Sequence, residues 1–66
     1  MVMIRSEYIG KEVKIITTDE VGYCGTVVEV EGPEDTESGE PEIGINFAGG
    51  IRMFTESEII SIYCEN

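Results

Sequence analysis

Histidine and tryptophan are both missing from this 66-residue chain, and basic side chains are scarce. Without histidine, the usual general base that activates a serine or cysteine nucleophile is absent. The sequence also lacks a GxSxG elbow and a phosphate-binding loop, because no lysine is followed by serine or threonine. Its acidic side chains crowd one polar segment instead of lining an apolar pocket. We therefore expect a protein that is not an enzyme and that carries no cofactor.

Positive charge is the second scarcity. Fourteen acidic residues stand against four basic ones, which gives a formal net charge of −10. Proteins gain affinity for nucleic acid by neutralising phosphates with lysine and arginine, and an anionic membrane attracts the same side chains. Only Arg5, Lys11, Lys14 and Arg52 are available for this. We expect no direct binding to nucleic acid or membrane, whereas a basic protein surface would be attracted.

Cysteine is too rare for the disulfide framework of a small secreted domain. Cys24 and Cys64 are far apart in the sequence, and neither belongs to a CxxC motif. A zinc site would need more cysteine or histidine ligands than this chain has. We expect both thiols to be reduced and to act as small core residues. One disulfide between them is the alternative.

Long hydrophobic runs are also missing. No segment approaches the length of a membrane span. The apolar run at residues 1–4 is too short for a signal peptide, since Arg5 interrupts it. The chain length fits one domain, residues 1–66, that buries a modest core. We expect a cytoplasmic, single-domain protein.

What the sequence does have is short runs of β-branched residues without helical periodicity. They predict strands over residues 11–17, 23–31, 42–48, 51–55 and 59–64. Gly25 marks a bulge or a close backbone approach, Gly49-Gly50 predicts a two-residue hairpin turn, and residues 56–58 predict one helical turn. Strand alternation predicts a core of Val13, Ile15, Val28, Val30, Ile43, Ile45, Phe47, Ile60 and Ile62.

Residues 32–41 interrupt this pattern with two glycines, both prolines and four acids, and contain no large apolar side chain. This composition predicts a solvated acidic loop, mobile over residues 33–41. Carboxylates are ligands that calcium accepts, but their spacing here differs from the EF-hand loop. A solvated run of charge is therefore the favoured interpretation, and no metal is expected.

Acidic residues are concentrated around this loop. The stretch from residue 29 to residue 42 holds seven of the fourteen acids and no base. It either keeps a small apolar domain soluble or engages a basic partner. The candidate partner-binding residues are Glu29, Glu31, Glu34, Asp35, Glu37, Glu40 and Glu42. Alternatively, Tyr8, Tyr23 and Tyr63 line a groove for proline-rich or methylated ligands.

Two segments resemble known small barrels. Residues 43–62 (IGINFAGGIRMFTESEIISI) resemble the second half of Src-homology-three-like barrels. Residues 10–30, with Gly25 before a valine-rich strand, are similar to the KOW motif and to the first half of Sm-like domains. The resemblance implies an all-β, five-stranded barrel, closed or partly closed, with the acidic loop outside it. The basic residues with which KOW and Sm-like domains bind RNA are missing, as is the Sm-like asparagine after the acidic residue of the second strand. The resemblance therefore implies a fold and not a ligand.

These observations favour a non-catalytic binding module that mediates protein–protein interaction. The alternative is an acidic inhibitor of the phage or mobile-element type, which imitates nucleic acid in the basic groove of its target. A third hypothesis, an Sm-like or KOW-like RNA-binding domain, would need a basic face built from Lys11, Lys14 and Arg52. The oligomeric state is left open.

Overall fold

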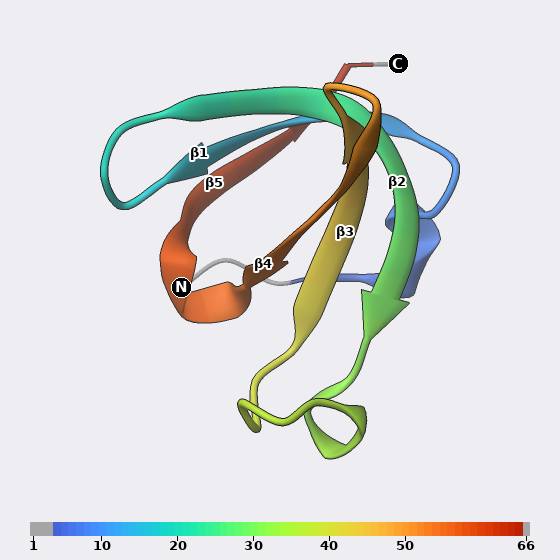
Figure 1. Cartoon of the computed structure of the whole chain (residues 1–66), viewed down its shortest axis with the longest axis vertical. Helices are drawn as coiled ribbons and strands as arrows, with labels where there is room; N and C mark the ends of the chain where they lie inside the picture. The colour runs from blue at the N-terminus through green and yellow to red at the C-terminus, as the bar shows by residue number, and fades with distance from the viewer. Residues whose placement is uncertain (1–3, 66) are drawn as a thin grey trace.

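The structure, a computed structural model, describes residues 4–65 and contains five antiparallel strands in one sheet (Figure 1). The strands are β1 (Glu12–Thr17), β2 (Gly22–Glu31), β3 (Glu42–Phe47), β4 (Gly50–Thr55) and β5 (Ile59–Cys64). Three 3-10 turns accompany them: η1 (Ser6–Tyr8), η2 (Pro33–Asp35) and η3 (Glu56–Glu58). The all-β prediction and the turn before the last strand are confirmed. The apolar run at residues 1–4 lies largely outside the described residues.

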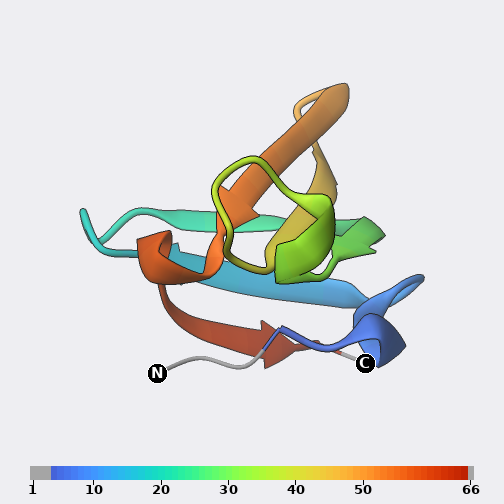
Figure 2. The ribbon, with the colours of Figure 1, turned by 90° about the horizontal axis from the view of Figure 1, so that it is seen from below.

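The strand order in the sheet is β4-β3-β2-β1-β5. β2 holds the two halves of the sheet together, because its first half pairs with β1 and its second half pairs with β3. It bends through a wide arc, which turns β3 and β4 across the direction of β1 and β5 (Figures 1 and 2). The two halves therefore face each other, and the core lies between them.

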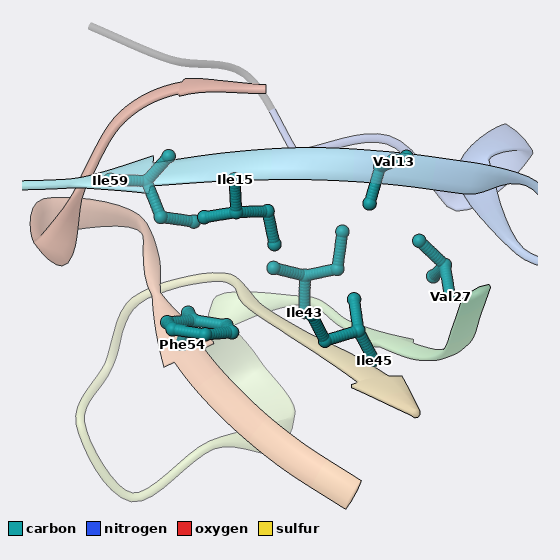
Figure 3. Packing of buried hydrophobic residues seen from close by; sticks show 7 residues of the cluster. All are labelled: Val13, Ile15, Val27, Ile43, Ile45, Phe54 and Ile59. Carbon is teal, nitrogen blue, oxygen red and sulfur yellow. The ribbon is translucent and has the colours of Figure 1, made fainter. Parts of the chain in front are cut away.

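The core is built from side chains that point toward one another from all five strands (Figure 3). Its fully buried members are Val13, Ile15, Val27, Ile43, Ile45, Phe54 and Ile59. Of the other residues predicted to be core, Val30, Phe47 and Ile62 are half-buried and pack against this cluster. The predictions for Val28 and Ile60 are wrong, since both side chains are exposed.

A β-bulge in β2 explains the error at Val28. Val27 pairs with Ile45 of β3, but the next partner of β3 is Glu29, so β2 has one extra residue at this point. A bulge shifts the alternation of side chains by one position. Val27 and Val30 consequently both face the core, although they are three residues apart, and Val28 is 44% exposed.

A second irregularity, in β5, explains the error at Ile60. Ile16 of β1 pairs with Ser61, whereas the adjacent Thr17 pairs with Ile59. The extra residue is Ile60, which is 52% exposed. The preceding Ile59 is buried in its place.

The hairpin turn between β3 and β4 is shifted by one residue from its predicted position. Phe47 and Gly50 form the closing pair, so the turn is Ala48-Gly49 and Gly50 belongs to β4. Both turn residues have positive φ, 53° at Ala48 and 83° at Gly49. Two positive-φ residues form a type I′ turn, whose twist matches that of the flanking strands.

Both cysteines are exposed and free, so the prediction that they are core residues is wrong. Cys24 of β2 lies opposite Lys14, and Cys64 of β5 lies opposite Val13, which places β1 between the two thiols. Neighbouring strands are about 4.8 Å apart, so the two Cα atoms are separated by roughly 10 Å. A disulfide needs a Cα separation of less than about 7 Å. The chain therefore cannot form this bridge without moving its strands.

The bulge gives a matched pair of substitutions. Val27→Ala removes two methyl groups from the core and should lower the free energy of unfolding by about 1–3 kcal/mol. Val28→Ala makes the same chemical change on the surface and should alter it by no more than about 0.5 kcal/mol. Urea unfolding of both variants measures the difference. A larger loss at Val28 than at Val27 would contradict the bulge.

Gly25 gives a second test. The predicted close backbone approach is confirmed, because a Cβ atom at Gly25 would collide with the carbonyl oxygen of Asn46 on β3. Gly25→Ala should therefore lower the free energy of unfolding by about 1–3 kcal/mol. Gly50→Ala is the control, since no atom lies within 4 Å of its Cβ position. It should change the stability by no more than about 1 kcal/mol. Equal losses of stability for Gly25→Ala and Gly50→Ala in denaturant unfolding would show that the close approach of Asn46 does not exclude a side chain at Gly25.

Candidate protein-binding face

The surface of β2, β3 and β4 that points away from the core carries an ordered arrangement of side chains. Residues that lie directly opposite each other on neighbouring strands share one face of a sheet. The pairing produces three cross-strand rows: Thr26–Asn46–Ile51, Glu29–Gly44–Met53 and Glu31–Glu42–Thr55. We call these nine residues the outer face. Its acids, Glu29, Glu31 and Glu42, stand on β2 and β3, and its large apolar side chains, Ile51 and Met53, stand on β4.

Negative charge is concentrated on the β2 side of the outer face. Glu31 lies directly opposite Glu42, and Glu29 precedes Glu31 on the same face of β2. The pKa of Glu31 is raised above its usual value, first by a hydrogen bond between its carboxyl group and that of Glu29 and next by desolvation. The charges of Glu29, Glu42 and Asp35 raise it further. Glu29, Glu42 and Asp35 therefore lie close enough to Glu31 for their charges to act on it.

Apolar side chains occupy the β4 side of the same face. Ile51 is 63% exposed and Met53 is 37% exposed. The sulfur of Met53 and a methyl group of Ile51 fill the space in which a side chain at Gly44 would lie, at 2.5 Å and 3.3 Å from its Cβ position. The Cβ of Glu29 is 3.5 Å from that same position. The acidic and the apolar parts of the face therefore both border Gly44.

Among the predicted partner-binding residues, Glu40 has a structural role instead. Its carboxylate accepts hydrogen bonds from the backbone N–H of Ser57 at 2.8 Å and from the Ser57 hydroxyl at 3.1 Å. These bonds attach residues 32–41 to the start of η3. The backbone N–H of Glu56 reinforces the attachment by donating to the carbonyl of Pro41.

The other predicted partner-binding residues of the acidic loop do not lie together. The charge of Asp35, in η2, acts on Glu31 and contributes to its raised pKa. Glu34 is exposed and its carboxylate lies beside Gly32. Glu37 is exposed as well. The structure thus brings together Glu29, Glu31, Asp35 and Glu42, and it leaves Glu34, Glu37 and Glu40 outside the cluster.

The three tyrosines do not line one groove. Tyr23 packs against Phe47 and Phe54, with ring centroids 5.2 Å and 5.0 Å away, and the guanidinium of Arg52 lies 4.8 Å from its centroid. This cluster borders a small cavity of about 240 Å³. Tyr8 lines a different groove, and Tyr63 is exposed.

Comparison of the chain with protein-family models, with curated proteins and with solved structures gave no match. Within residues 4–65, no helix has both the length and the apolar character needed to cross a membrane. The same residues contain no group of three or more acidic or cysteine side chains placed to hold a metal ion.

The raised pKa of Glu31 predicts a pH-dependent gain in stability for Glu31→Gln. A raised pKa means that the folded chain binds the proton more tightly than the unfolded chain. Wild-type stability therefore falls as the pH rises from the usual glutamate value to the raised one. Glu31→Gln removes this effect and should have a higher urea midpoint at pH 7, with the gain shrinking in more acidic buffer. Glu20→Gln, in the exposed β1–β2 turn, is the control for net charge alone. An equal gain from Glu20→Gln would contradict the local repulsion.

Proposed function

We propose that this chain is a non-catalytic protein-interaction module whose outer face binds a basic segment of a partner protein. The observation that carries the proposal is that an acidic column (Glu29, Glu31 and Glu42) and the exposed apolar side chains of Ile51 and Met53 share one face of the sheet. Acids alone would also serve solubility. Ile51 and Met53 beside them give a partner something to bury.

The proposal includes a finer description of the fold, a partly open Src-homology-three-like barrel. The strand order and the bend of β2 support it. η3 joins β4 to β5, the two strands at the ends of the sheet order. The Thr18 N–H donates to the Glu58 carbonyl, which connects this turn to the loop after β1. Free, exposed thiols at Cys24 and Cys64 suit a reducing compartment, so the proposal includes residence in the cytoplasm.

Charge and apolar contact make different contributions to the proposed binding. An exposed ion pair contributes only about 0.2–1 kcal/mol, so Glu29, Glu31 and Glu42 mainly attract and orient a basic segment. Apolar contacts with Ile51 and Met53 then supply most of the affinity. A lysine or arginine beside Glu31 would also favour its ionised form and relieve the repulsion within the acidic column.

A second candidate is the acidic inhibitor that occupies the basic groove of a nucleic-acid-binding protein. The specific observation in its favour is the gathering of acids around Glu31, whose pKa is raised by a hydrogen bond with Glu29, by desolvation and by the charges of Glu29, Glu42 and Asp35. Such a local density of negative charge resembles that of a phosphate backbone. In this alternative, nucleic acid and the chain compete for one partner surface.

The test is affinity capture from the native cell with two charge-matched triple variants. The face variant combines Glu29→Gln, Glu31→Gln and Glu42→Gln. The control variant changes three exposed acids outside the outer face: Glu20→Gln, Glu37→Gln and Glu65→Gln. Each triple removes three acids from a chain of net charge −10, which leaves −7. The face variant should lose its partner, and the control variant should retain it.

A further variant, Met53→Ser, separates the two contributions. It leaves the charge unchanged and should weaken capture, because an exposed apolar contact is lost. Release of the partner by excess duplex DNA would favour the inhibitor, and retention would favour the general module. Equal capture by the face and control variants would contradict both candidates.

A further inference from the structure

A groove of about 520 Å³ lies on a different part of the molecule from the outer face. It forms between the segment that precedes β1 and the edge strand β5, two parts that are distant in sequence. Its lining residues are Arg5, Glu7, Tyr8, Lys11, Ile60, Ser61 and Ile62. None of these belongs to β2, β3 or β4.

Backbone hydrogen bonds hold the walls of the groove in place. The Gly10 N–H donates to the Val27 carbonyl at 2.8 Å, and the Val27 N–H donates to the Lys11 carbonyl at 2.9 Å. The Lys11 N–H donates in turn to the Tyr8 carbonyl at 2.9 Å. The N-terminal wall is therefore anchored to β2, and the other wall is a strand of the sheet. A ligand would meet a groove that is already formed.

The chemistry of the groove is the reverse of that of the outer face. Arg5 and Lys11 are two of the four basic residues of the chain, and Glu7 is the single acid that lines the groove. Arg5 pairs with Glu7 at 3.2 Å, and both side chains are more than half exposed. Within residues 4–65, Lys11 has no ion-pair partner.

The groove also offers apolar surface. Ile60 is 52% exposed because the irregularity of β5 turns it out of the core. Ile62 and Tyr8 lie beside it, half-buried against the core. An apolar side chain next to a negative charge would match these features, since it could cover Ile60 while a carboxylate meets Lys11 and competes with Glu7 for Arg5. A basic segment would meet two like charges.

We propose that this groove binds an extended acidic segment of a partner protein, with apolar side chains against Ile60 and Ile62 and carboxylates against Arg5 and Lys11. The Debye length in physiological salt is about 8 Å, so these two cations act locally despite the negative charge of the whole chain. The groove and the outer face have opposite charge and share no residue. The chain can consequently hold two partners of opposite charge at once.

The experiment titrates the full chain with two blocked peptides of equal length and follows its amide NMR signals. One peptide alternates valine with glutamate, and the other alternates valine with lysine. The glutamate peptide should shift the amide signals of Tyr8, Lys11 and Ser61 in a saturable way. The lysine peptide should not.

Matched variants assign the effect to the groove. Lys11→Glu should weaken the glutamate peptide roughly three- to tenfold. Lys14→Glu makes the same charge change on an exposed residue outside the groove and should have little effect. Ile60→Ser should weaken binding without any change in charge. Binding should persist when Glu29, Glu31 and Glu42 are changed to glutamine, which separates this proposal from the one for the outer face.

Several results would overturn the proposal. No saturable shift of the groove amides, equal binding of both peptides, or equal weakening by Lys11→Glu and Lys14→Glu would each do so. A dilution series of the peptide-free chain tests whether a second copy of the chain occupies the groove. If dilution moves the same amide signals, a second copy of the chain fills the groove in place of an acidic partner.

Discussion

The bulge at Val28 is the constraint on which the core and the outer face both depend. In the first half of β2, Tyr23 and Val27 face inward, and uninterrupted alternation would then turn Glu29 and Glu31 inward as well. Burying two unpaired carboxylates is far more costly than distorting one step of a ladder. The extra residue instead turns both acids outward and Val30 inward. One strand thereby serves an apolar core at one end and a charged surface at the other.

The outer face follows from this shift. Because Glu29 is turned outward, it lies in one row with Gly44 and Met53, and the acidic column adjoins the apolar side chains of β4. The arrangement has an electrostatic cost within the folded chain, which the raised pKa of Glu31 expresses. A basic partner would relieve that cost by bringing positive charge to the column. In the proposed complex, the charges that oppose folding would favour association.

Sequence alone predicted much of this structure, and its errors have physical causes. Short runs of β-branched residues located all five strands, because that pattern is local. It could not assign every face, because a bulge depends on pairing with another strand, and Val28 and Ile60 were therefore placed in the core. The acidic column was anticipated in part. The hydrogen bonds from Ser57 of η3 to the Glu40 carboxylate are a tertiary contact, which no local sequence pattern predicts. The outward position of Met53 was not predicted. Met53 directly precedes Phe54 on β4, and neighbouring residues of a strand point to opposite faces of the sheet.

The most direct test of this account is the register between β2 and β3, measured from cross-strand contacts in NMR spectra of the full chain. The account predicts that Val27 lies opposite Ile45 and that Val30 lies opposite Ile43, three residues apart on β2 and two on β3. This spacing occurs only with an extra residue in β2. A contact that instead places Glu29 opposite Ile43 would show an uninterrupted ladder. It would contradict the bulge, the core and the outer face together.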